Sequence, residues 1–402
     1  MLKNKIGLLI SWPREIDIFS KFFEIKSSKI DFIVNDNFSF EKGRNFSNKK
    51  IVEILKEKKI VFRYFSEIYK KEKYKVIIST GEFSGFHISI YSILRFIYGR
   101  TIGSALEYFG LSLFFLKKFG RSFTADGKNS RIGISIFPEK KIGKIIVKFP
   151  DGIDIKKKNY PYDFYKNIFD IFFSYCDFEI DLIQNKFNSK ILKKIDYFRY
   201  NYVQRDNGNL KKLDHKIDKA KKTIYWLPTH IDNGKDEDKN LLNWIYKLNF
   251  LNKDFNIVLR PHPKTISRNQ DLINKISELN YILDVDFNKN IGEAIINSDL
   301  IFADYGGIVF DTLYLEKKII LLDLDPEINF VKTLKHMESV DIDIRNHLKT
   351  LKAEYTENDI KSILRFVIDE NPEKVKELKN YYFGKKDYLN FKQTLRYLED
   401  LL

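Results

Sequence analysis

Two clusters of polar residues follow apolar runs in the second half of the chain. Arg260-Pro261-His262-Pro263 follows the run NIVL, and Pro228-Thr229-His230 ends the run TIYWL. Arginine binds phosphate through paired hydrogen bonds, and histidine donates to a developing phosphate charge or moves a proton. The prolines fix the backbone around His262 and prevent a strand from continuing. We interpret Arg260 and His262 as functional. Thr229 binds a phosphate or caps the next segment, and a ligand contact and a solvated loop position remain equally open for His230.

A glycine turn forms the third cluster. The segment SDLIFADYGGIVFDTLYLEKKIILLD (298–323) is typical of a strand, a turn at Tyr305-Gly306-Gly307, a helix and a second strand. A helix start exposes unpaired N–H groups and the positive end of the helix dipole, which suits a phosphate. The segment therefore predicts an anionic, nucleotide-type ligand. Asp311, one helical turn after Gly307, accepts from a ligand hydroxyl or serves helix packing, and packing is slightly favoured.

Candidates for a general base lie in the first half of the chain. Asp151 follows the run KIIVKFP, and Glu82 lies in the polar loop STGEFSG (79–85) after the run KVII. A carboxylate serves as a base for a hydroxyl when burial raises its pKa above the reference value of ~3.9. Asp151-Gly152 is also a common turn dipeptide, and an ordinary loop is favoured for Glu82. Lys156, in a run of three lysines, binds an acceptor phosphate or belongs to a solvated face.

The elements that must position these residues alternate between strands and helices. The first half shows β-rich runs at 5–11, 30–36, 59–65, 75–80, 131–137 and 144–150, with a helical region at 86–119. Positions 160–215 look helical and then loop-like. The second half predicts strands at 222–228, 255–261, 281–285, 300–303 and 319–323 with helices between them, and helices from 356 with a break at Asn371-Pro372.

This alternation indicates an α/β fold with mainly parallel sheets. We predict two doubly wound, Rossmann-like domains of GT-B type that face a central cleft, with a helical C-terminus. The first domain spans 1–218 and the second spans 219–402. Ligands of such sheets bind at the carboxyl ends of the strands, where all three clusters lie.

Composition limits the classes of partner. The 402 residues carry a formal net charge of +15, which suits a phosphorylated substrate, an anionic membrane surface or nucleic acid. No Lys/Arg-rich arm or nucleic-acid motif is present, so we expect no nucleic-acid partner. Cys176 is the single cysteine, which excludes an internal disulfide, fits a cytoplasmic protein and indicates a buried structural thiol.

The stretch 86–119 is the most membrane-like part of the sequence. Arg95, Arg100 and Glu107 interrupt it, so it lacks the ~18 consecutive apolar residues of a spanning helix. It forms core helices of the first domain, which is favoured, or presents aromatic and basic residues to an anionic membrane. The N-terminal run KIGLLI predicts a first strand and not a signal peptide.

Three segments, taken in order, resemble the CDP-glycerol glycerophosphotransferase (teichoic-acid polymerase) family. They are TIYWLPTHID (223–232), NIVLRPHP (256–263) and the glycine-turn segment 298–323. The resemblance implies a GT-B fold, a CDP-linked donor and transfer of a polyol phosphate to an acceptor hydroxyl, with CMP leaving. It also implies that Arg260 and His262 stabilise the leaving diphosphate and that the backbone N–H groups of Tyr305, Gly306 and Gly307 wrap it.

Two positions depart from the family pattern. Gly306 and Gly307 stand where the family has serines, which keeps the backbone contacts and removes two hydroxyl donors. KFPDGIDIKKK (148–158) resembles the family's His-Gly segment, but Asp151 stands where the family has its catalytic histidine. The base is therefore Asp151 or Glu82 in this interpretation.

The resemblance leads to a transferase of cell-surface polymer synthesis as the first hypothesis. Its acceptor is a lipid-linked or membrane-proximal glycan, and its place is cytoplasmic or peripheral on the inner face of the cell membrane. No P-loop or zinc-binding helix is present, so we expect no metal or other cofactor. A glycosyltransferase that uses a CMP- or UDP-sugar for capsule or lipopolysaccharide, and a non-catalytic nucleotide- or polymer-binding protein, remain as alternatives. A sugar-nucleotide epimerase is less favoured.

Overall fold

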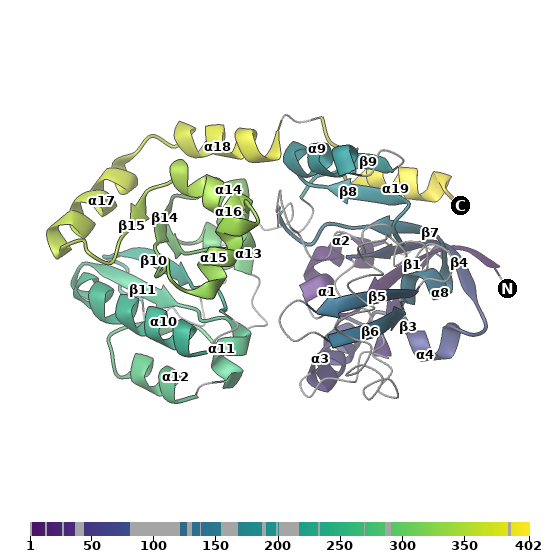
Figure 1. The fold of residues 1–402 in the computed structure, drawn as a ribbon, viewed down its shortest axis with the longest axis horizontal. Coiled ribbons are helices and arrows are strands. Elements are labelled where there is room, and N and C mark those ends of the chain that lie inside the picture. Colours follow the sequence, from purple (N-terminus) through teal and green to yellow (C-terminus); the bar gives the residue numbers. More distant parts are fainter. Residues whose placement is uncertain are drawn as a thin grey trace. The chain divides into compact units, whose positions relative to one another are not determined.

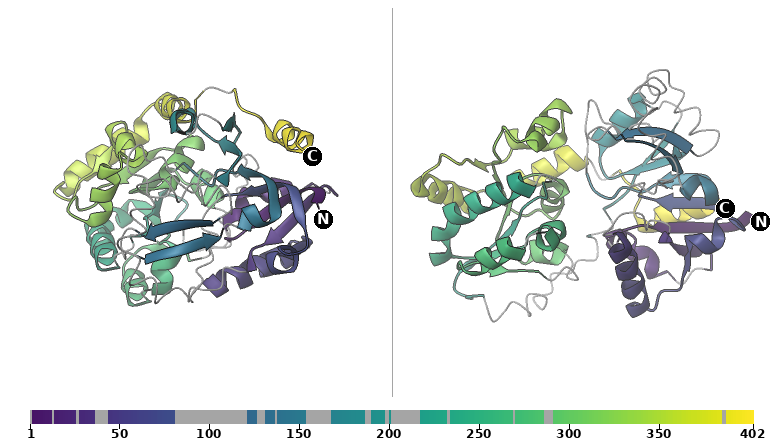
Figure 2. Two further views of the ribbon diagram at one scale, coloured as in Figure 1. Left: turned by 45° about the vertical axis from the view of Figure 1, so that its right-hand side comes forward. Right: turned by 60° about the horizontal axis from the view of Figure 1, so that its bottom comes forward.

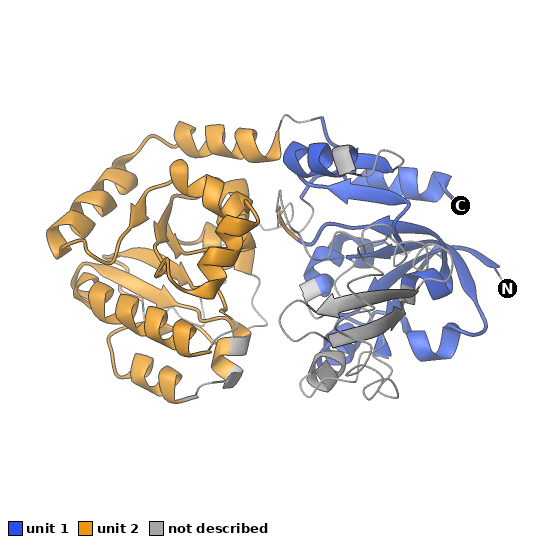
Figure 3. Cartoon of the chain, viewed as in Figure 1, with its two compact units in different colours: residues 1–151, 160–199, 386–402 blue, residues 152–159, 200–385 orange. Residues whose placement is uncertain are grey.

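The chain folds into two compact units, which Figure 3 colours blue and orange. The first unit comprises Met1–Asp151, Tyr160–Arg199 and Lys386–Leu402, and the second comprises Gly152–Asn159 and Tyr200–Lys385. The sequence placed one boundary at 218/219, whereas here the last residues return to the first unit. The computed structural model describes residues 2–12, 14–25, 28–36, 44–80, 121–126, 131–136, 138–153, 168–186, 190–197, 200, 217–231, 234–268, 270–285, 291–384 and 387–402.

A parallel sheet forms the centre of the first unit. Its described strands follow the order β3 (Phe62–Tyr64), β2 (Ile30–Val34), β1 (Leu2–Ile10), β4 (Lys73–Ser79), β7 (Gly143–Lys148), β8 (Ile171–Ser174) and β9 (Ile191–Lys194). Every neighbouring pair is parallel, and Ile6 of β1 lies between Ile30 of β2 and Val76 of β4. The strand order reverses between β1 and β4, as in a doubly wound Rossmann-like sheet.

Short helices connect these strands. They are α1 (Arg14–Ile18), α2 (Ser20–Phe23), α3 (Arg44–Glu57), α4 (Phe65–Ile68), α8 (Pro138–Ile142) and α9 (Asp177–Lys186). A separate antiparallel pair, β5 (Arg121–Asp126) and β6 (Arg131–Ile136), completes the described part of the unit.

The sequence misassigned part of this unit. The region 160–215 was expected to be helical and then loop-like, but it contributes β8 and β9 on either side of α9. All four residues of β8 are buried, and a short run that is apolar on both faces carries no periodicity that separates strand from helix. β5 was missed as well.

The second unit contains the predicted parallel sheet. Its described strands follow the order β12 (Ile282–Leu283), β11 (Phe255–Leu259), β10 (Lys222–Leu227), β13 (Leu300–Ala303), β14 (Ile319–Leu322) and β15 (Thr350–Leu351). All pairings are parallel, and the order reverses between β10 and β13. Five of these strands were predicted, whereas the two-residue edge strand β15 was not.

Helices cover both faces of the second sheet (Figures 1 and 2). Five of these helices contribute to the site described below: α10 (Gly234–Leu248), α11 (Pro263–Arg268), α14 (Gly307–Tyr314), α15 (Asn329–His336) and α16 (Val340–Asp343). The others are η6 (Asn249–Lys253), α12 (Gln270–Ser277), α13 (Ile291–Ile296), η7 (Ile344–Asn346), α17 (Glu357–Asp369) and α18 (Glu373–Phe383). Trp244 of α10 is buried against the sheet core that includes Trp226, and its Nε1 donates to the carbonyl of Asp323 at 2.8 Å.

The C-terminal helices divide between the two units. α17 and α18 stay with the second unit, and the break between them lies at Asn371-Pro372, as predicted. α19 (Phe391–Asp400) packs on the first unit, where Phe391 meets Phe22 at 5.2 Å and Tyr397 meets Phe173 at 6.0 Å between ring centroids. In Figure 1 the yellow α19 accordingly lies beside the teal strands β8 and β9.

Two further expectations concern membrane contact and the cysteine. Within the described ranges, no helix has the length and apolar character needed to cross a membrane. The stretch 86–119 lies outside the described residues. Cys176 is 1% exposed, and burial raises the pKa of its thiol to about 12, which confirms the predicted buried thiol.

Because α19 packs on the first unit, weakening its packing should destabilise that unit and not the second. Leu398 is fully buried, so Leu398→Ala should cost roughly 2–5 kcal/mol, the usual range for a buried leucine. Hydrogen exchange measured by mass spectrometry should accelerate in β8 and β9 and stay unchanged in β10 and β11. Arg396→Ala on the exposed side of the same helix is the control and should change neither. Equal acceleration in both sheets would contradict the assignment of α19.

Candidate functional site

The predicted site residues of the second unit gather at the carboxyl edge of its sheet. Thr229 and His230 follow β10, Arg260 and His262 follow β11, and the turn 304–307 follows β13. Because β10 and β13 are adjacent and the strand order reverses between them, the loops after them border the position where doubly wound sheets bind ligands. Side-chain contacts show how these loops are joined.

A buried aspartate joins the loops after β10 and β13. Asp304 Oδ1 accepts from the backbone N–H of Thr229 at 2.8 Å and from that of Tyr305 at 2.8 Å. Burial raises the pKa of Asp304 to about 6, although these two donors and the charge of Arg345 act in the opposite direction. One carboxylate therefore fixes the backbone on both sides of the point where the strand order reverses.

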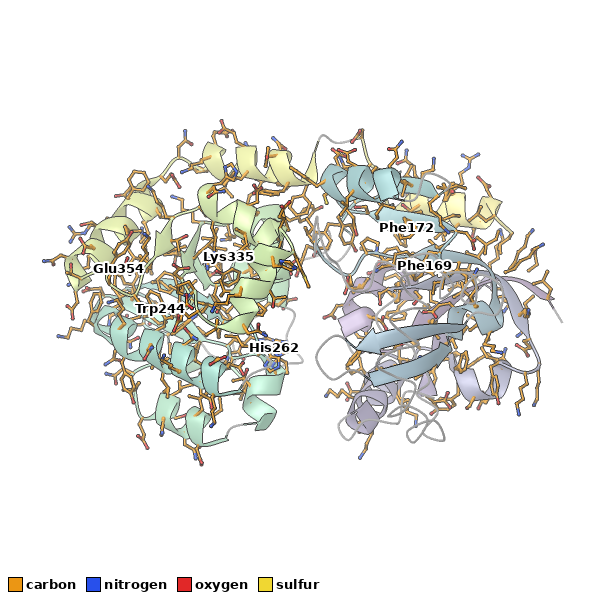
Figure 4. The ribbon with its side chains drawn as sticks, in the orientation of Figure 1. Phe169, Phe172, Trp244, His262, Lys335 and Glu354 are labelled. Atoms are coloured by element: carbon orange, nitrogen blue, oxygen red, sulfur yellow. The ribbon has the colours of Figure 1, made fainter. Side chains whose placement is uncertain are left out.

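The two histidines of the neighbouring loops stack on each other. The ring centroids of His230 and His262 are 5.3 Å apart and the ring planes differ by 21°. The carbonyl of His262 accepts from the N–H groups of Thr265 at 2.9 Å and Ile266 at 3.2 Å, so His262 begins α11 (Figure 4). Pro263 occupies the first helical position, where a missing N–H costs nothing. His230, which the sequence left open, is thus brought to His262.

A buried glutamate that the sequence did not suggest holds this pair. Glu237, in the first turn of α10, is 3% exposed. Its Oε1 lies 3.2 Å from Nδ1 of His230 and also accepts from the hydroxyl of Thr265 in α11. Glu237 therefore links the loop that carries His230 to the helix that follows His262.

Arg260 is anchored beneath the loops by an acidic partner. Its side chain is 8% exposed, and its Nη1 lies 3.5 Å from Oδ2 of the buried Asp284, which follows β12. The hydroxyl of Tyr225 donates to the same Asp284 oxygen. Burial, followed by the charge of Asp284, raises the pKa of Tyr225 well above its usual value, so this hydroxyl keeps its proton. The arrangement fixes a positive charge at the sheet edge.

The glycine turn departs from the expected anion cradle. The N–H of Tyr305 donates to Asp304, and the N–H of Gly306 donates to Oδ1 of Asp341 at 2.8 Å. These two N–H groups already donate to carboxylates. A donor phosphate could bind them only by displacing Asp304 and Asp341. Gly307 differs, because a Cβ placed there would meet no atom within 4 Å. Of the three residues, Gly307 offers the most open approach to the start of α14.

The ring of Tyr305 contacts a cation and a second aromatic ring. The guanidinium of Arg345 lies 3.9 Å from the ring centroid, and Phe330 of α15 meets it edge-on at 5.7 Å. Arg345 also donates to the carbonyl of Leu322 at 3.0 Å and lies 3.6 Å from Asp323. Arg345 therefore places a cation beside the turn, among Asp304, Asp323 and Asp341.

The remaining predicted residues have varied positions. Asp311 is buried and accepts from the hydroxyl of Tyr200 at 2.8 Å, which is the kind of contact expected for packing. Asp151 is partly exposed and follows β7 in the first unit. Glu82 and Lys156 lie outside the described residues.

The first unit has a related clasp where its strand order reverses. Glu15 accepts from the N–H groups of Ser11 and Trp12 after β1 and from the hydroxyl of Thr80 after β4. The buried amine of Lys148 donates to the carbonyl of Thr80 from the end of β7. Carboxylates therefore tie the central strand ends in both units.

Four contributors were missed by the sequence: Glu237, Asp284, Asp341 and Arg345. Asp341 lies 35 residues from Gly306 along the chain, so the sequence gave no signal of their contact. The others lie in ordinary helical or loop sequence. Within the ranges that the structure describes, no group of three or more His, Cys, Asp or Glu side chains could hold a metal ion.

Comparison with solved structures identifies the fold. Wall teichoic acid polymerase TagF, as a variant, matches with a TM-score of 0.56 and 14% identity over 100% of this chain and 88% of that chain. A UDP-N-acetylglucosamine 2-epimerase matches with a TM-score of 0.54 and 12% identity over 100% and 96%. The epimerase of Neisseria meningitidis bound to UDP-GlcNAc matches with 0.51 and 13% over 100% of both chains. These likenesses confirm the GT-B fold.

A family comparison is more specific. Residues 177–328 match the family described as CDP-Glycerol:Poly(glycerophosphate) glycerophosphotransferase. The match contains all three segments on which the resemblance was based, whereas Asp341 and Arg345 lie beyond its end. The resemblance to this family is thereby confirmed for that part of the chain. No curated protein matches the chain.

The glycine turn predicts a contrast between two neighbouring substitutions. Gly306 has φ 92° and ψ −179°, a conformation that essentially only glycine adopts. Gly306→Ala should therefore destabilise the protein by roughly 1–3 kcal/mol. Gly307→Ala has room for its methyl group and should be neutral or slightly stabilising. Urea unfolding of both variants measures this, and equal losses would show that the turn has another conformation.

Asp304 predicts a specific dependence of stability on pH. Its folded pKa of about 6 exceeds the unfolded reference of ~3.9, so its contribution to stability is greatest below pH ~4 and falls as pH rises through 6. Asp304→Asn keeps an acceptor oxygen and removes the titration. The variant should gain up to about 3 kcal/mol relative to the native protein between pH 4 and 7. Urea unfolding across this range measures the difference, and a difference independent of pH would refute the raised pKa.

Proposed function

We propose that the protein is a glycerophosphotransferase that moves glycerol phosphate from CDP-glycerol to an acceptor hydroxyl in the synthesis of a teichoic-acid-like polymer. The observation that carries the proposal is the family match over residues 177–328. This match includes the loops after β10, β11 and β13, in which Thr229, His230, Arg260, His262 and the turn 304–307 lie. The family match, together with the convergence of these loops at one edge of the second sheet, supports a donor site there.

The donor is best assigned to the second unit. TagF has been studied with CDPG soaked into its crystals, and its structure shares the fold of this chain. In the proposed reaction the acceptor oxygen bonds to the phosphorus that carries glycerol, and the bond from that phosphorus to the bridging oxygen breaks. CMP leaves with the bridging oxygen and its electron pair. His230, His262 and Arg260 stabilise the charge that develops there, as positioned donors do in phosphoryl transfer.

The acceptor side completes the proposal. A carboxylate of the first unit, Asp151 or Glu82, takes the proton of the acceptor hydroxyl, and Lys156 binds an acceptor phosphate. We infer a lipid-linked or membrane-proximal glycan as the acceptor, because the net charge of +15 favours anionic surfaces and polymers. We therefore propose that the protein acts in the cytoplasm, peripherally at the inner face of the cell membrane.

Removal of His262 tests the donor site. Release of CMP from CDP-glycerol should fall by roughly 10²–10³-fold in His262→Ala, the usual cost of losing one positioned donor. His336→Ala is a matched control, because His336 is exposed at the end of α15. Chromatography of the nucleotide products measures both rates with a glycerol-phosphate primer as acceptor.

A panel of donors separates the proposal from its alternatives. CMP- and UDP-sugars should give no turnover under the same conditions. Turnover of a nucleotide sugar in place of CDP-glycerol would establish a glycosyltransferase or an epimerase instead. Binding of CDP-glycerol without any transfer, unchanged in His262→Ala, would favour a binding protein.

A further inference from the structure

The buried carboxylate of Glu237 fixes the proton on one side of the His230 ring. Its Oε1 lies 3.2 Å from Nδ1 of His230, and a carboxylate oxygen there can only accept a hydrogen bond when it is ionised. The hydroxyl of Thr265 donates to the same oxygen. With Glu237 ionised, Nδ1 of His230 carries a proton, and Nε2 is the nitrogen left for a ligand.

A proton on Nδ1 decides what Nε2 can offer to a phosphate. In a neutral ring with Nδ1–H, Nε2 is an acceptor and would repel a phosphate oxygen. Only the imidazolium form donates from both nitrogens, to Glu237 on one side and to the phosphate on the other. An anionic partner on each side stabilises that form, as in carboxylate-oriented catalytic histidines.

We propose that Glu237 is the positioning residue of the donor site and that binding of the nucleotide diphosphate is coupled to uptake of one solvent proton at Nε2 of His230. The proposal rests on the proposed function and deepens it. It concerns a residue that touches His230 and not the donor. Glu237 orients the ring, selects Nδ1–H and balances the charge that His230 gains.

The neighbouring charged groups are consistent with one protonated ring. His262, which begins α11, stacks on His230 at 5.3 Å, and two stacked imidazolium ions would repel each other. The carboxylate of Glu237, 3.2 Å from Nδ1 of His230, balances a positive charge on that ring. Asp304, from the turn after β13, accepts from the N–H of the adjacent Thr229, and Arg260 after β11 is directed to Asp284. Proton uptake is therefore assigned to His230.

Calorimetry of donor binding tests the coupling. CDP-glycerol is titrated into the full-length protein at pH 7.5, without acceptor, in buffers that differ in ionisation enthalpy. Both phosphoryl groups of this ligand are diesterified and stay ionised, so it brings no titrating phosphate. Because the proposal gives the His230 ring one proton, at Nδ1, before the donor binds and a second one afterwards, the native protein should take up about half a proton or more per donor bound.

Two variants separate charge from geometry. Glu237→Gln keeps an acceptor oxygen for His230 and Thr265 but removes the charge, so proton uptake should fall close to zero and the Kd should rise about tenfold, as expected for the loss of a hydrogen bond to a charged group. Thr265→Val keeps the contact between Glu237 and His230, so it should retain the uptake even if binding weakens. His230→Gln should abolish the uptake. Nitrogen-15 NMR of the histidine rings should show Nδ1–H for His230 in the native protein, identified by its loss in His230→Gln.

The outcomes separate this inference from the proposed function. Donor binding with no proton uptake, or with equal uptake in the native protein and Glu237→Gln, would overturn the role of Glu237 and leave the transferase assignment intact. Absence of any binding of CDP-glycerol would overturn both. A native Nε2–H tautomer in the NMR spectrum would also reject the positioning role, whatever the calorimetry shows.

Discussion

The hydrogen bonds from the N–H groups of Thr229 and Tyr305 to Asp304 hold the site together. The backbone N–H groups that follow a parallel strand have no partner within the sheet. Where the strand order reverses, the chain leaves two adjacent strands in opposite directions, and the N–H groups of both loops lie near each other. A buried carboxylate satisfies both and fixes the spacing of the two loops. Its cost is a buried acid whose pKa is raised to about 6, which the charge of Arg345 partly offsets. The stacked histidines and the glycine turn depend on this spacing.

The same physical solution occurs in each unit with different consequences. In the first unit Glu15 takes the amides of the turn after β1 and the hydroxyl of Thr80. In the second unit Asp304 and Asp341 take the amides of Thr229, Tyr305 and Gly306. What distinguishes the second unit is the group of cations and imidazoles around these acids. Under the proposed function, recognition of a diphosphate there would rely on side chains more than on the amides of the helix start.

The sequence predicted the second unit better than the first because its signals were local. Five of its strands are apolar runs bounded by proline, glycine or aspartate, and each βα loop carries its own polar residues. In the first unit, β8 is buried on both faces and β9 has only four residues, so neither shows a period. The site residues were likewise predictable only where the signal was local. Arg260, His262 and Gly306 were visible from motifs, whereas Glu237, Asp284 and Arg345 act through contacts between distant elements that no spacing reveals.

The return of α19 to the first unit has a consequence for how the chain is made. Synthesis proceeds from the N-terminus, and domains generally fold as units while the chain emerges. Residues 200–385, most of the second unit, leave the ribosome before Phe391 and Leu398, which pack into the first unit. The second unit can therefore complete its core while β8 and β9 still lack the helix that covers them. The order in which the cores are completed can thus run against the order of the sequence: the second unit, with its candidate site, can close before the first unit receives α19.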